Sequence, residues 1–210
     1  MWLIRPLLAP VLVLFLALAG FVAPALAEPT FPKLTGRVVD AANIIPADVE
    51  VRLTQKIEAL EKNSRRQLVV VTIPDLEGYE ISDFGYRLGR AWGLGDKQRN
   101  DGALIIVALS QRRVRVEVGY GLEGILTDGL SSLIIERAII PRFKAGDMPG
   151  GIEAGTDALI RQLTLPESEA RAQAKAADQA VERAQDDTGI GLASLFPLLI
   201  FGIWGLMALG

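Results

Sequence analysis

The sequence contains neither histidine nor cysteine, and these two absences exclude several kinds of chemistry. A Ser-His-Asp or Cys-His catalytic arrangement is impossible, and there are no disulfides and no thiolate nucleophile. Zinc and copper lose their usual ligands, so a bound metal must be held by oxygen atoms, which favours calcium, magnesium or manganese. Basic residues do not outnumber acidic ones. The formal net charge of the 210 residues is -3, which argues against nucleic-acid binding.

Hydrophobic residues make up half of the sequence and are concentrated at its two ends. Residues 1–27 combine Arg5, an apolar stretch and a final Ala-x-Ala, which is typical of a secretory signal peptide cleaved before Glu28; an uncleaved anchor is the alternative. Residues 188–210 contain a long uncharged stretch that spans roughly 31 Å as a helix, enough to cross a membrane. We therefore predict a single-pass membrane protein whose central domain is extracytoplasmic, either periplasmic or extracellular.

Residues 166–187 are rich in alanine, glutamine and charged side chains. Such a composition favours a helix, but the segment has no clear apolar stripe that would pack against a core. We interpret it as a charged, solvated helical stalk between a domain at 28–165 and the membrane anchor. A partner-binding coiled coil is the weaker alternative, because its core positions would mostly be alanine.

The central domain alternates between helical and strand patterns. Continuous apolar runs at 67–73 and 102–109 predict buried strands, and the alternation at 114–118 predicts an antiparallel hairpin partner for the second of them. Helical spacing of apolar residues predicts helices at 46–64 and 81–94, and two more at about 128–140 and 148–164. The order β-α-β-α-β-β-α-α predicts an α/β fold with a mixed sheet.

Gly119, Gly121 and Gly124 match the G-x-G-x-x-G pattern of dinucleotide-binding turns. That turn requires a buried parallel strand followed by a helix, whereas these glycines follow a half-polar hairpin strand. We therefore expect no dinucleotide. The glycines instead let the chain leave the sheet and bring its backbone close to a neighbouring loop.

Four segments occur in order: "GRVVDAANIIP", "WGLGDKQRNDGALIIVAL", "RRVRVEVGYGLEGILTD" and "FKAGDMPGGIEAGTDALI". Together they resemble the TPM-domain family over residues 31–165. The resemblance implies a three-layer α/β/α sandwich. Members of the family include a plant protein described as an acid phosphatase and bacterial domains described as calcium-binding. A signal peptide and a C-terminal anchor also match the bacterial branch, although this chain lacks the glycine-rich tail of many bacterial members.

Oxygen-bearing side chains are found in the loops of these segments. If the loops meet at one edge of the sheet, their carboxylates would repel one another unless a cation balanced them, and calcium accepts such loosely arranged ligands. The alternatives are a plain turn at Asn100-Asp101-Gly102 and a helix N-terminal charge at Asp128. The predicted ligands of Ca²⁺ (or Mg²⁺) are Asp40, Asp96, Asn100, Asp101, Glu123 and Asp128.

Two functions are compatible with these residues, and a structural or assembly role without any ion is a third possibility. The first is a membrane-tethered accessory or protein-interaction module that binds calcium and an unknown envelope protein. The alternative is a metal-dependent acid phosphatase, in which the metal activates water and Arg99 holds phosphate. We interpret three other arginines, Arg112, Arg113 and Arg115, as solvated surface charge. Trp92 is interpreted as a core residue, and Tyr120 as a residue that borders the acidic loops.

Overall fold

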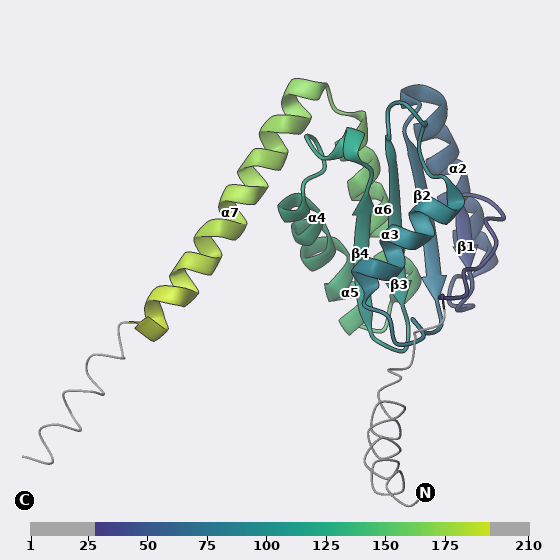
Figure 1. Cartoon of the computed structure of the whole chain (residues 1–210), viewed down its shortest axis with the longest axis horizontal. Helices are drawn as coiled ribbons and strands as arrows, with labels where there is room; N and C mark the ends of the chain where they lie inside the picture. The colour runs from purple at the N-terminus through teal and green to yellow at the C-terminus, as the bar shows by residue number, and fades with distance from the viewer. Residues whose placement is uncertain (1–27, 194–210) are drawn as a thin grey trace, which may run out of the picture. The chain divides into compact units, whose positions relative to one another are not determined.

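The computed structural model describes residues 28–193, which form an α/β fold around a four-stranded mixed sheet (Figure 1). Strands β1 to β3 run parallel to one another, and β4 pairs antiparallel with β3. The predicted hairpin is therefore confirmed. The strands lie side by side in chain order, as β1 (Val38–Asp40), β2 (Gln67–Ile73), β3 (Gly102–Ala108) and β4 (Arg113–Val118).

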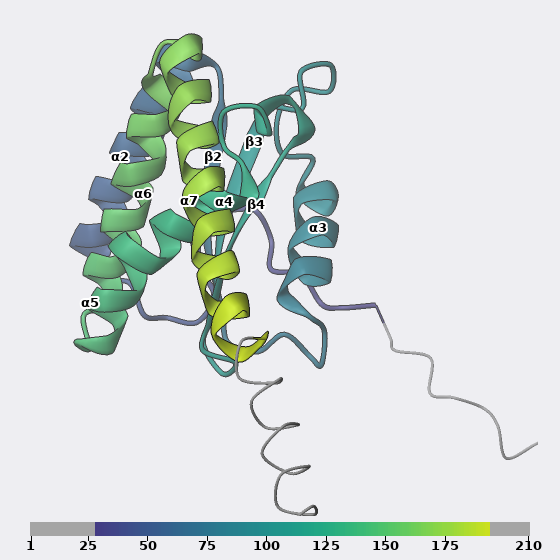
Figure 2. The same ribbon diagram turned by 90° about the vertical axis from the view of Figure 1, so that its left-hand side faces the viewer.

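Helices cover both faces of the sheet, with α2 (Ala47–Ser64) and α6 (Met148–Thr164) on one face and α3 (Ile81–Trp92) on the other (Figure 2). The central strands β2 and β3 are buried on both faces, which is why their sequences are continuously apolar. The predicted helix at 148–164 is confirmed. Trp92 is half-buried against the α3 side of the core, and its indole N–H donates to the Pro32 carbonyl at 3.0 Å.

The predicted helix at 128–140 is longer and less regular than expected. It consists of α4 (Asp128–Ile134), a π-helical turn over Ile135–Ile139 and α5 (Ile140–Lys144). Pro141 lies in the first turn of α5, where its missing N–H costs little, so a proline that would interrupt a continuous helix is accommodated after the wide π turn.

Helix α7 (Glu167–Ala193) corrects the expectation of a wholly solvated stalk. Ala170, Ala174 and Ala177 in the first part of the helix are buried, and α7 packs against α4. Asp178 also accepts a hydrogen bond from the Thr127 hydroxyl at 2.7 Å. The sequence did not reveal this buried face because its residues are all alanine, which contributes little to an apolar pattern. The helix starts near the beginnings of β2 and β3 and runs towards the opposite end of the sheet (Figure 1).

The predicted signal peptide at 1–27 and most of the predicted membrane span at 188–210 lie outside the described residues. Within residues 28–193, no helix is both long enough and apolar enough to cross a membrane.

Candidate functional site

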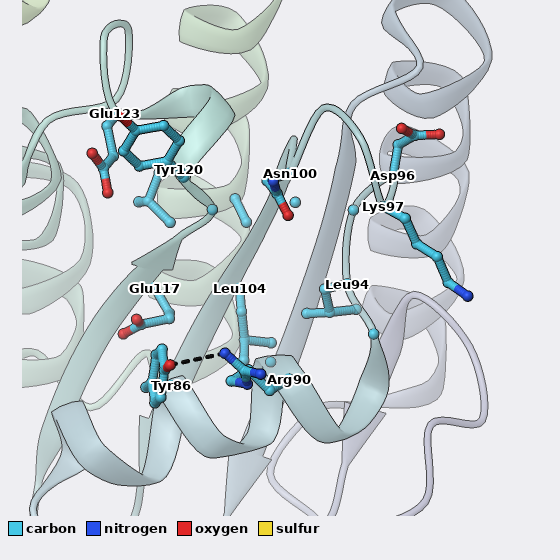
Figure 3. Close-up of a pocket in the computed structure, with 17 residues that line it drawn as sticks. Tyr86, Arg90, Leu94, Asp96, Lys97, Asn100, Leu104, Glu117, Tyr120 and Glu123 are labelled. Atoms are coloured by element: carbon cyan, nitrogen blue, oxygen red, sulfur yellow. Dashed lines mark hydrogen bonds between the residues drawn. The ribbon is translucent and has the colours of Figure 1, made fainter.

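A groove of about 630 Å³ opens at the edge of the sheet where β3 begins and β4 ends (Figure 3). One wall comes from the end of α3 and the segment 93–97 that follows it. The opposite wall is the turn 119–123 after β4, and the first residues of β3 lie between the two walls. Segments far apart in the sequence therefore meet at this edge.

The glycine turn after β4 lies directly against the loop that precedes β3. The Gly119 N–H donates to the Gly102 carbonyl at 2.7 Å, and the Gly121 N–H donates to the Asn100 carbonyl at 3.0 Å. A Cβ atom at Gly121 would overlap the carbonyl oxygen of Arg99. The predicted role in a close backbone approach is confirmed for Gly119 and Gly121, whereas Gly124 lies against the side chain of Arg171. The turn follows an antiparallel strand and leads into a short 3₁₀ helix, Tyr120–Leu122, which is not the strand-turn-helix context of a dinucleotide site.

Two aspartates shape the loop before β3. Asp96 Oδ1 accepts the N–H groups of Gln98 at 2.9 Å and Arg99 at 3.0 Å, and these bonds lower the pKa of Asp96. Asp101 is 7% exposed; its Oδ1 accepts the Asp96 N–H at 3.0 Å and its Oδ2 accepts Arg99 Nε at 2.7 Å. Asp96 is therefore ionised at neutral pH, and both carboxylates hold the loop in shape.

Three of the predicted ligands line the groove. In Figure 3, Glu123 lies beside Tyr120 on one side, Asp96 lies on the other side, and Asn100 lies between them. The Tyr120 side chain is 79% exposed, and its predicted position beside the acidic loops is confirmed. Asp101 lies in the loop that carries Asp96 and Asn100, but it is not among the residues that line the groove.

The structure does not bring Asp40 or Asp128 to the groove. Asp40 ends β1, and because β1 to β3 are parallel, this position lies at the opposite edge from the start of β3. Its carboxylate accepts the N–H groups of Ile44 at 3.1 Å and Ile45 at 2.8 Å, so it shapes a loop. Asp128 is exposed in the first turn of α4, where the helix dipole favours a negative charge. Within residues 28–193, no three acidic side chains are grouped so that they could hold a metal ion together.

Arg99, the predicted phosphate ligand, is already engaged by Asp101 and Asp96, and the hydrogen bond that it donates to Asp101 raises the pKa of Arg99. Two of the three surface arginines also have acidic partners: Arg113 pairs with Glu80 at 2.6 Å and Arg115 with Glu117 at 2.7 Å.

Sequence reasoning missed two groove residues on α3. Arg90 donates to the Tyr86 hydroxyl at 3.0 Å, and its guanidinium lies 5.5 Å from the centre of the Tyr86 ring (Figure 3). Both side chains are exposed. Tyr86 and Arg90 are four residues apart, so their side chains are neighbours on the surface of the helix, away from the buried Phe84 and Leu88. This spacing is the sequence pattern that could have identified the pair.

Comparison with known proteins places this fold among related domains. The TPM domain family matches residues 38–162. The N-terminal domain of a protein from P. gingivalis, solved by NMR, is 37% identical with a TM-score of 0.58, and the match covers 61% of this chain and 82% of that domain. No curated protein matches the chain.

Two further solution structures resemble the chain in fold alone. The N-terminal domain of a Corynebacterium glutamicum protein is 14% identical with a TM-score of 0.50, and the match covers 69% of this chain and 91% of that one. A protein from the psychrophilic Bizionia argentinensis is 18% identical with a TM-score of 0.51, and the match covers 60% of this chain and 94% of that one. With the family match extending over more than half of its length, the chain belongs to the TPM-domain family.

Proposed function

We propose that this protein is a membrane-tethered, extracytoplasmic binding module of the cell envelope whose groove takes up a calcium ion. The observation that supports the proposal is that Asp96, Asn100 and Glu123 line one groove from its two sides. Magnesium, which demands near-ideal octahedral geometry, fits such an open set of ligands less well. Asp40 and Asp128 are not part of the proposed site.

The donor set fits an open calcium site and does not fit a closed cage. Calcium accepts six to eight oxygen atoms in flexible geometry, including amide and backbone carbonyl oxygens and water. Among the described residues, no side chain or backbone N–H is bonded to the Glu123 carboxylate, so its oxygens are available. Asp96 keeps its negative charge because its pKa is lowered. Water would complete the coordination in the open groove.

An envelope protein is the proposed partner of the ion-bound turn. Tyr120 would make the contact, because its side chain is 79% exposed beside the proposed ligand Glu123. A tyrosine offers both apolar area and a hydroxyl group, which suits a protein interface.

A metal-dependent acid phosphatase in the same groove is the alternative function. It needs a cation that is free to hold phosphate, and Arg99 is engaged by Asp96 and Asp101. Arg90 lines the groove but contacts Tyr86. We therefore propose ion and protein binding as the function, with hydrolysis as the alternative.

The proposal predicts that calcium changes the groove and no other part of the domain. The isotope-labelled, full-length protein in detergent micelles would be titrated with calcium chloride and followed by NMR. We expect saturable shifts of the backbone amides at 95–101 and 119–124, with an affinity of about a millimolar or tighter, as in extracellular calcium modules. Glu123→Gln should weaken binding about tenfold, because it removes one charged ligand.

Asp128→Asn is the matched control, since Asp128 is an exposed acidic residue outside the groove. Calcium affinity should be unchanged in this variant. An absence of saturable shifts in the groove, or an equal loss of affinity in Asp128→Asn and Glu123→Gln, would contradict the proposal.

A further inference from the structure

A second hollow, of about 510 Å³, lies beside the groove and shares the segment Gly95 to Lys97 with it. It is formed by the end of α2, the start of β2 and the loop before β3. Its lining residues are Glu61, Arg65, Gln67, Gly95, Asp96, Lys97 and Arg99. Arg65 and Lys97 have no role in the proposed calcium site.

The acidic residues of this hollow already have partners. Glu61 forms an ion pair with Arg37. Asp96 accepts two backbone N–H groups and lies 3.5 Å from the Arg99 guanidinium. Neither carboxylate therefore depends on the remaining cations of the hollow for neutralisation.

Arg65 and Lys97 are the cations that remain. Within the described part of the chain, neither side chain forms a hydrogen bond or an ion pair. The backbone of Arg65 is fixed as the C-cap of α2, with a φ of 60° and its N–H donating to the Glu61 carbonyl at 2.8 Å. The Lys97 side chain points away from Tyr120 and Glu123, and so away from the far wall of the groove (Figure 3).

We propose that this hollow binds an oxyanion, a carboxylate or phosphate group, between Arg65 and Lys97. Two unneutralised cations attached to an ordered backbone attract an anion, and both side chains can donate charge-assisted hydrogen bonds to its oxygen atoms. Arg99 adds positive charge to the hollow, although it is held by Asp101 at 2.7 Å. The oxyanion site uses different side chains from the calcium site, so either proposal can fail without the other.

The test is an NMR titration of the labelled, full-length protein in uncharged detergent micelles and calcium-free buffer. Inorganic phosphate and a triglutamate peptide would be added separately. We expect saturable shifts of the amides of Arg65 and residues 95–99 at millimolar concentrations of at least one probe. The double variant Arg65→Gln/Lys97→Gln should bind about tenfold more weakly, since it loses two charge-assisted contacts.

Arg112→Gln/Lys144→Gln is the matched control. Arg112 is also exposed with a positive φ, of 52°, and lies in the β3–β4 turn at the opposite edge of the sheet. Lys144 is an exposed lysine at the end of α5 and does not line either hollow. Binding of phosphate alone would identify a phosphoryl group as the ligand, and binding of the peptide alone would identify a carboxylate. The absence of saturable shifts with either probe at about 20 mM, or equal weakening in both double variants, would overturn the proposal.

Discussion

Gly121 is the position at which a single methyl group would most disturb the edge of the sheet that carries the groove. Its N–H is bonded to the Asn100 carbonyl, and its α-carbon lies against the Arg99 carbonyl oxygen. Both contacts involve backbone, which cannot move aside as the end of a flexible side chain can. The loop that carries Asp96 and Asn100 is thus held in place from the turn after β4.

Gly121→Ala should therefore lower the free energy of unfolding by about 1–3 kcal/mol, the usual cost of overpacking, and shift the amide resonances of residues 95–101. Chemical denaturation and NMR would measure the two effects. Gly36→Ala is the control, because no atom lies within 4 Å of the position of its Cβ. A Gly121→Ala variant as stable as Gly36→Ala would show that the close approach is not needed.

Individual residues were predictable to different extents. The close approach at Gly119 and Gly121 followed from the strand context of the motif, although the partner loop was not identified. The prediction that Asp40 joins the other ligands was wrong because β1 and β3 run in the same direction. The end of β1 and the start of β3 therefore lie at opposite edges of the sheet. The ion pair of Arg99 with Asp101 depends on a backbone turn that residue spacing does not specify.

At the scale of secondary-structure elements, α7 is the helix whose packing the sequence concealed. The small methyl groups of three buried alanines and the Thr127–Asp178 hydrogen bond attach it to the rest of the domain. Strands β2 and β3, in contrast, are long apolar runs whose burial was evident from the sequence. A contact made by alanine lacks the large side chains on which hydrophobic periodicity depends.

Ala174→Glu should release the start of α7 from α4, because it places a charged side chain at a position that is 1% exposed. We expect amide hydrogen exchange in residues 170–178 to become about tenfold faster, since the docked helix would open more readily. Ala172→Glu is the matched control at an exposed position two residues away. Equal exchange rates in the two variants would show that the alanine contact does not hold the helix.

At the scale of the whole molecule, charged side chains join the two long helices on one face of the sheet. Lys56 on α2 lies 3.1 Å from Glu153 and 2.8 Å from Asp157 on α6, and Arg52 lies 3.3 Å from Glu153. The hydrogen bonds from Arg52 and Lys56 lower the pKa of Glu153. Since Glu153 binds its proton less readily when folded, its contribution to stability is complete above its unfolded pKa and is lost as the pH falls through the lower folded value.

The free energy of unfolding should therefore decrease between about pH 5 and pH 3, and it should decrease less steeply in Glu153→Gln. The difference should be about 1 kcal/mol or less, because the ion pairs are partly exposed to solvent. Denaturant titrations at the two pH values would measure it. Glu58→Gln on α2 is the control at an exposed position, and an identical pH dependence in both variants would contradict this account.

The path of α7 has a consequence for how a ligand reaches the domain. Helix α7 starts near the edge of the sheet that carries the groove and runs towards the other end. Its 27 residues extend for roughly 40 Å. In the membrane-tethered protein that we propose, the membrane would lie on the side towards which α7 runs. The groove and the second hollow would then lie at the end of the domain that is away from the membrane. Soluble molecules, or the exposed parts of neighbouring proteins, could then enter them without approaching the bilayer.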